Sequence, residues 1–69
     1  MTRSLRVNGV SETMAADTVA GLLRARGIDP AARFLAIAVN GAVVRRLDWE
    51  SRRLEPGDAV EIVAPRQGG

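Results

Sequence analysis

The dipeptide Asn-Gly occurs twice in this chain, and each copy stands between two short apolar runs. Asn and Gly are the residues that most readily take the positive φ angles of a two-residue turn between antiparallel strands. Each copy therefore predicts a β-hairpin. At Asn8-Gly9 the hairpin is expected to join a strand around Leu5 and Val7 to a strand over Val10–Met14. At Asn40-Gly41 the same arrangement is expected farther along the chain.

A helical pattern separates the two hairpins. Val19, Leu22 and Leu23 recur at the spacing of one face of a helix. Asp17 is expected to cap the helix N-terminus, because its carboxylate can accept hydrogen bonds from the free amides of the first turn. Gly27 is placed to end the helix in a left-handed conformation.

Three strands are expected beyond the helix. The second hairpin joins the apolar run 35–39 to Ala42–Val44. Pro56-Gly57 fits the central positions of a type II turn, since Gly allows the positive φ of the second one. Apolar and polar residues then alternate over Ala59–Ala64, which predicts the last strand. Pro65 cannot donate to a ladder, so we expect strand pairing to end there.

This order of elements is typical of an α+β, ubiquitin-like β-grasp fold. A mixed sheet of four to five strands is expected, with one main helix packed across it. A length of 69 residues predicts a single domain, with a globular body over 1–64 and a flexible Gly-Gly tail over 65–69. Periodicity assigns the core to Leu5, Val7, Leu22, Leu23, Ile37, Val60 and Ile62.

The composition argues against an enzyme. The chain contains no Cys and no His, so disulfides, a thiol nucleophile, the commonest general base and the commonest metal ligands are all missing. We expect no catalytic residue, no metal and no bound cofactor. If the chain takes part in chemistry, it does so as a substrate or carrier. Its apolar runs are far shorter than the ~20 residues that span a bilayer, and we expect a cytoplasmic protein without a membrane contact.

The charge pattern argues against nucleic acid as a partner. The net charge is +2, and all ten basic residues are Arg with acidic residues between them. Such spacing is typical of a solvated surface. We therefore interpret Arg45-Arg46 and Arg52-Arg53 as solvated charge, with the hypothesis that some of them meet acidic groups of a partner. Trp49 is interpreted as a half-buried structural residue rather than a docking contact, and Asp58 as a turn residue.

The sequence closes on Gln67, Gly68 and Gly69. Glycine has no Cβ, so a Gly-Gly tail can enter a narrow channel that other residues would block. A terminal carboxyl group is an anion at neutral pH. Gly69 is the position at which we expect chemistry, offered to the active site of another enzyme.

Several short motifs occur in one order along the chain: Val7-Asn8-Gly9, Thr18-Val19, Leu22-Leu23, the run from Ala38 to Val44, Arg46, Trp49, Leu54, Pro56-Gly57-Asp58, the run from Val60 to Val63, and Gln67-Gly68-Gly69. Together, in a chain of this length, they resemble the ThiS family, the bacterial sulfur carrier proteins of thiamine biosynthesis. The resemblance covers essentially the whole chain. Pro65-Arg66 departs from the small or aliphatic residues that are more usual there, which affects the fit of the tail to a partner.

The resemblance implies a cycle that other enzymes run. An adenylyltransferase of the ubiquitin-activating type would use Mg-ATP to convert the Gly69 carboxylate to an acyl-adenylate. Sulfur from the persulfide of a cysteine desulfurase, or from another persulfide donor, would replace the adenylate and leave a thiocarboxylate. Thiazole synthase would then take the sulfur into the thiazole ring, with Gly68 and Gln67 giving the tail access to each active site.

Other functions share parts of this pattern. The small sulfur-carrying subunit of molybdopterin synthase, or another thiocarboxylate carrier, would have the same fold and tail. A ubiquitin-like protein modifier would also end in Gly-Gly. A small S4-like RNA-binding module shares the run from Val39 to Val44 and the later Leu54–Asp58, although Phe34 and Trp49 are the sole aromatic residues and offer no stacking platform.

Overall fold

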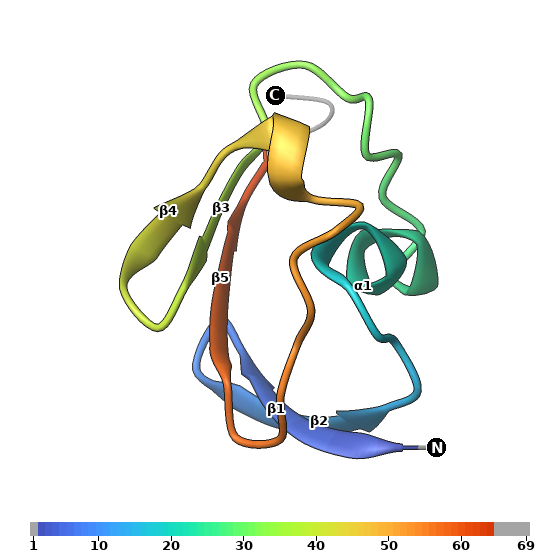
Figure 1. Cartoon of the computed structure of the whole chain (residues 1–69), viewed down its shortest axis with the longest axis vertical. Coiled ribbons are helices and arrows are strands. Elements are labelled where there is room, and N and C mark those ends of the chain that lie inside the picture. The colour runs from blue at the N-terminus through green and yellow to red at the C-terminus, as the bar shows by residue number, and fades with distance from the viewer. Residues whose placement is uncertain (1, 65–69) are drawn as a thin grey trace.

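The structure is a computed structural model that describes residues 2–64 (Figure 1). Residues 1 and 65–69 are not described, so the expectations for Pro65, for the flexible tail and for Gln67, Gly68 and Gly69 lie outside the described residues. The described chain forms the elements β1 (Arg3–Val7), β2 (Val10–Met14), α1 (Val19–Ala25), β3 (Ala36–Val39), β4 (Ala42–Val44), the 3-10 helix η1 (Arg46–Asp48) and β5 (Ala59–Val63).

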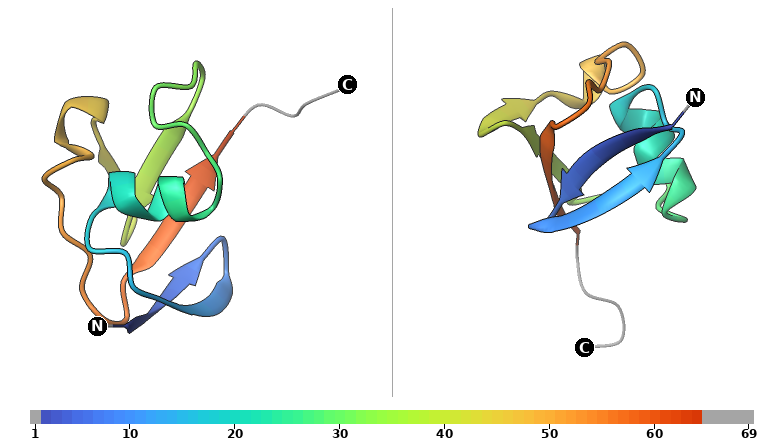
Figure 2. Two further views of the ribbon diagram at one scale, coloured as in Figure 1. Left: turned by 90° about the vertical axis from the view of Figure 1, so that its right-hand side faces the viewer. Right: turned by 90° about the horizontal axis from the view of Figure 1, so that it is seen from below.

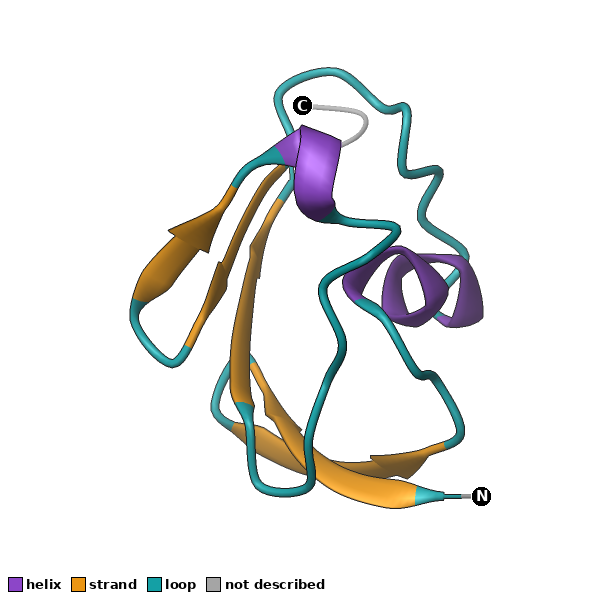
Figure 3. Cartoon of the chain, in the orientation of Figure 1, coloured by secondary structure: helices purple, strands orange, loops and turns teal. Residues whose placement is uncertain are grey.

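The five strands form one mixed sheet in the order β2-β1-β5-β3-β4. β5 is the central strand, parallel to β1 and antiparallel to β3. The helix α1 lies across one face of the sheet, and no element of the described chain covers the other face (Figure 2). Long loops join α1 to β3 and η1 to β5 (Figure 3). The expected β-grasp fold, with a mixed five-stranded sheet and one main helix, is confirmed.

Both predicted hairpins are present. Asn8 and Gly9 have φ angles of 51° and 83°, and Asn40 and Gly41 have φ angles of 52° and 84°. Positive φ at both central residues is the geometry that a two-residue turn needs to match the twist of its strands. The Asn-Gly pairs therefore set the register of each hairpin directly.

The start of α1 differs from the prediction by one residue. Thr18, not Asp17, is the N-cap, and its hydroxyl oxygen accepts a hydrogen bond from the Gly21 amide at 3.1 Å. The Asp17 carboxylate instead accepts from Nη2 of Arg3 at 3.0 Å. Both residues are acceptable caps by type, so a contact with a distant strand decided which side chain reached the helix.

The end of α1 agrees with the prediction. Gly27 has a φ of 76°, and its amide donates to the Arg24 carbonyl at 3.0 Å. The Ile28 amide donates back to the Leu23 carbonyl at 2.8 Å, and the Ile28 side chain packs on the core. These two bonds make a Schellman motif, which satisfies carbonyls that the helix end leaves free.

The core lies between α1 and the sheet. Its buried apolar residues are Leu5, Val7, Val19, Ala20, Leu22, Leu23, Leu35, Ile37, Val39, Trp49, Leu54 and Val60. Ile62 is only half-buried and packs at the margin of this cluster, whereas the other six expected core residues are buried. Trp49 is 3% exposed, so it is more deeply buried than expected, and its indole Nε1 donates to the Val44 carbonyl at 2.8 Å. That burial supports the structural interpretation of Trp49.

Candidate functional site

The end of β5 is the place where the described chain leads toward residues 65–69. Val63 is the last residue of the strand and Ala64 the last described residue. Gln67, Gly68 and Gly69, the predicted site residues, lie outside the described part, so the structure places none of them. It does show what holds β5 in position and what surface surrounds its end.

β5 is held on its two sides in different ways. On one side β3 pairs with it along four residues, from Ala36 opposite Val63 to Val39 opposite Val60. On the other side β1 pairs with it at only two positions, Ala59 and Val60. Beyond Val60, β1 has already turned away into its hairpin, so the β5 amides that face β1 need another acceptor.

The side chain of Asn8 supplies that acceptor. Its Oδ1 accepts a hydrogen bond from the Ile62 amide at 2.8 Å, while the Asn8 amide donates to the Val60 carbonyl at 2.9 Å. The first hairpin turn therefore continues the ladder where β1 has stopped. This bond fixes β5 to within two residues of Ala64.

The Asn of the second hairpin holds the other end of β5. Oδ1 of Asn40 accepts from the Ala59 amide at 2.9 Å, and its Nδ2 donates to Oδ1 of Asp58 at 2.9 Å. Sequence reasoning assigned both Asn residues to turns and missed their contacts with β5. The available clue was the residue type, because a positive-φ Asn has a side chain that both donates and accepts.

Asp58 does more than complete a turn. The turn itself is as predicted, with Gly57 at a φ of 89° and the Asp58 amide donating to the Glu55 carbonyl at 3.1 Å. The side chain is only 9% exposed, and its Oδ2 accepts from the Glu55 amide at 2.8 Å. Burial by itself raises the pKa of the Asp58 carboxyl. The hydrogen bonds from Glu55 and Asn40 and the charge of Arg52 outweigh burial, so that the pKa lies below its ordinary value.

An apolar surface lies beside the end of β5, on the sheet face opposite α1. Ala36 is paired with Val63, and Ala38 is paired with Val43, so their side chains form two neighbouring rows. We name Ala36, Ala38, Val43 and Val63 the outer-face patch. Together with Glu61 and Ile37 they line a shallow depression. Val43 is 79% and Val63 65% exposed, so the patch presents apolar side chains to solvent.

Comparison with known proteins identifies the family of this chain. The model of the ThiS family matches residues 4–69. The chain belongs to the ThiS family. Members of this family are sulfur carriers of thiamine biosynthesis, as the resemblance implied, and they are not enzymes, as the composition predicted. Among the alternatives, the match favours the thiamine carrier over the molybdopterin-synthase subunit, the protein modifier and the RNA-binding module.

Solved structures agree with the ThiS assignment. The chain is similar to the crystal structure of a thiamine biosynthesis protein, ThiS, from Geobacter metallireducens, with 32% identity and a TM-score of 0.76 over 96% of this chain and 99% of that one. It is also similar to an NMR structure of a thiamine biosynthesis protein from that organism, with 30% identity and a TM-score of 0.76 over 96% and 87% of the two chains. No curated protein sequence matches this chain.

In this ThiS-family chain the arginines of the two pairs Arg45-Arg46 and Arg52-Arg53 differ from one another in their contacts. Arg46 donates from Nη1 to the Pro30 carbonyl and from Nη2 to the Ala32 carbonyl at 2.7 Å, and its guanidinium lies 4.5 Å from the centre of the Trp49 ring. Arg46 is exposed, as a solvated charge is expected to be, and these contacts give it a structural role in addition. Arg45 is exposed and faces Asp48 at 3.8 Å.

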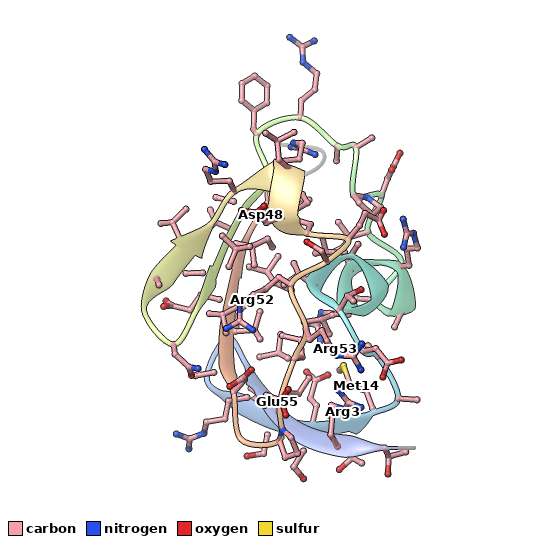
Figure 4. The ribbon with its side chains drawn as sticks, viewed as in Figure 1. Arg3, Met14, Asp48, Arg52, Arg53 and Glu55 are labelled. Atoms are coloured by element: carbon pink, nitrogen blue, oxygen red, sulfur yellow. The ribbon has the colours of Figure 1, made fainter. Side chains whose placement is uncertain are left out.

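The second arginine pair lies along the segment between η1 and β5. Figure 4 shows Arg52 and Arg53 on this segment, with Asp48 toward one end of it and Glu55 toward the other. Arg52 donates to the Arg53 carbonyl, and the backbone of Arg53 forms a bridge with Thr18. Neither of these contacts involves the outer-face patch.

Residues 2–64 contain no group of three His, Cys, Asp or Glu side chains that could hold a metal ion. Within the same range, no helix is long and apolar enough to cross a membrane. The contacts of Asn8 and Asn40 hold β5 in place, and the outer-face patch lies beside the end of that strand.

Proposed function

We propose that Gly69 is the sulfur-carrying residue, and that residues 1–64 are the body that presents the tail 65–69 to other enzymes. The observation that carries the proposal is the family match, which extends to residue 69 and so includes the Gly-Gly ending. The placement of β5 supports it. A central strand held by Asn8 at Ile62 gives the tail a fixed point of departure.

The proposed chemistry begins with activation. A carboxylate oxygen of Gly69 attacks the α-phosphorus of Mg-ATP on an adenylyltransferase, and pyrophosphate leaves. The terminal sulfur of a cysteine persulfide then attacks the acyl carbon and AMP leaves. A thiol that forms a disulfide with the donor cysteine releases the Gly69 thiocarboxylate. Mg-ATP belongs to the activating partner, and because the cycle consumes ATP we place it in the cytoplasm.

The partners are proposed from the same cycle: the adenylyltransferase, a cysteine desulfurase or another persulfide donor, and thiazole synthase. Five residues extend at most on the order of 15 Å. A partner whose active site receives Gly69 must therefore cover the body near Ala64. The outer-face patch lies there, and an exposed apolar surface of this kind is typical of a protein contact. Glycines lose more entropy on ordering than other residues, so we expect the body to supply most of the affinity.

The test is the intact mass of the chain after incubation with the adenylyltransferase, Mg-ATP, a cysteine desulfurase and cysteine. We expect one oxygen to be replaced by one sulfur. The matched control is the chain without Gly69, which keeps the body and should show no change. An unchanged mass of the full chain, with an adenylyltransferase that modifies a known ThiS protein under the same conditions, would refute the proposal.

A further inference from the structure

Two large apolar side chains are exposed near the end of β5, outside the outer-face patch. Phe34 is 78% and Leu47 84% exposed. Phe34 precedes β3 by two residues, and β3 begins opposite the last residue of β5. Leu47 lies in η1, which follows β4. Figure 1 shows η1 and the loop before β3 at the same end of the molecule as the end of β5.

The backbone of Phe34 has a conformation that its residue type disfavours. Its φ is 62°, whereas the other described residues with positive φ are all Asn or Gly. A bulky side chain at positive φ costs conformational energy, and an exposed phenyl ring gains no burial in return. Strain without a benefit to the free protein is found most often at binding and switch sites.

The loop that carries Phe34 is braced from behind. Arg46 donates to the carbonyls of Pro30 and Ala32, and the Ala31 amide donates to Oδ1 of Asp29 at 2.9 Å. Because Arg46 is adjacent to Leu47, the same guanidinium links η1 to the Phe34 loop. The backbone segments that carry both exposed side chains are therefore linked before any partner arrives, which lowers the entropy cost of binding.

Positive charge lies beside these apolar groups. The Arg33 guanidinium is 5.5 Å from the centre of the Phe34 ring, whereas the charge of Arg45 beside η1 faces Asp48 at 3.8 Å. An aromatic ring with a basic rim is complementary to an apolar pocket with carboxylates around it.

We propose that Phe34 and Leu47, with Arg33 at their rim, form a second anchor that binds an acid-rimmed apolar pocket of the adenylyltransferase. This inference rests on the proposed function. The activating step needs such an anchor most, because it brings the Gly69 carboxylate up to the phosphates of ATP, and both are anions. Affinity from the body has to offset their repulsion. Thiazole formation brings the thiocarboxylate to an electrophilic carbon instead and has no such repulsion.

The test measures the dissociation constant of the full chain for the adenylyltransferase by calorimetry, without ATP. We expect Phe34→Ala to weaken binding by about tenfold. Phe34→Gly removes both the ring and the strain, so it should weaken binding as much and raise the melting temperature. The control is Val10→Ala, which truncates a 60% exposed side chain on β2, the edge strand on the opposite side of the sheet from β4.

Three results would overturn the inference. The first is a change of less than about twofold for Phe34→Ala. The second is that Phe34→Ala weakens binding to thiazole synthase and not to the adenylyltransferase. The third is a lower melting temperature for Phe34→Gly, which would make Phe34 a structural residue. Removal of Gly69 separates this inference from the proposed function, since it should abolish sulfur loading and leave the calorimetric affinity within about twofold of the full chain.

Discussion

Asn40 donates a 2.9 Å hydrogen bond from Nδ2 to Oδ1 of Asp58, and this contact joins the β3–β4 turn to the turn that precedes β5. The other carboxylate oxygen of Asp58 accepts from the Glu55 amide at 2.8 Å. The Asp58 carbonyl accepts from the Arg6 amide at 2.9 Å, which adds β1 to the same cluster. The carboxylate and the backbone carbonyl of Asp58 thus together organise the entry to the central strand.

Asp58→Asn should destabilise the fold at neutral pH by about 1–2 kcal/mol, because an amide NH₂ would replace the oxygen that faces the Glu55 donor. The folded-state pKa of Asp58 lies below its ordinary value. Its contribution is therefore complete above the unfolded-state pKa of about 3.9 and is lost as pH falls through the folded-state pKa. Urea unfolding at pH 7 and pH 3, followed by Trp49 fluorescence, should show a smaller difference between the two proteins at pH 3.

The control for this experiment is Glu61→Gln, which changes an exposed carboxyl on β5 itself. We expect it to have little effect at either pH. A wild-type to Asp58→Asn difference that stays constant from pH 7 to pH 3 would contradict the role assigned to the Asp58 charge.

Asn8→Gly should weaken the attachment of β5. Gly keeps the positive φ that the turn requires, so in the folded state the substitution removes the side-chain acceptor of the Ile62 amide, while it also raises the entropy of the unfolded chain. We expect a loss of about 1 kcal/mol and faster hydrogen exchange at Ile62, measured by NMR. The amide of Val63, the next residue, serves as the internal reference. Unchanged exchange at Ile62 would show that water replaces Asn8 without loss.

Arg46→Ala should cost about 1–2 kcal/mol, because the guanidinium holds two loop carbonyls and lies over Trp49. Arg46→Lys should recover only part of the loss, since an ammonium group lacks the planar fork that reaches two acceptors. The measurement is urea unfolding followed by Trp49 fluorescence. The matched control is Arg45→Ala, an exposed neighbour whose removal should change stability by less than about 0.5 kcal/mol. Equal effects at the two positions would refute the assignment.

Thr18→Ala should destabilise the fold by about 1 kcal/mol, because the Gly21 amide loses its cap. Asp17→Ala tests the competing assignment, since Asp17 has the residue type of a cap but pairs with Arg3 instead. We expect the smaller loss at Asp17, where the carboxylate is 63% exposed. Thermal unfolding of both variants at neutral pH would decide between them, and a larger loss for Asp17→Ala would contradict the structure.

Local chemistry accounts for the parts of the fold that were predicted. A positive φ is required in the Asn-Gly turns, at Gly27 at the helix end and at Gly57 in the last turn. The type of the residue and of its two or three neighbours is enough to predict such a conformation. Strand alternation and helical spacing are equally local. The candidate site at Gly69 was predicted from the residue types of Gln67, Gly68 and Gly69 and stays a prediction.

The sequence by itself determined the β-grasp order of elements and half of the buried core, because both depend on patterns that repeat over a few residues. The carrier class followed from the resemblance along the whole chain and from the absence of Cys and His. Only the tertiary structure decided that Asn8 binds Ile62, 54 residues away, that Arg46 braces the Phe34 loop, and that Thr18 rather than Asp17 caps α1. These contacts depend on which distant segments the sheet brings together. A side chain with several possible partners takes the one that packing places within reach of a hydrogen bond.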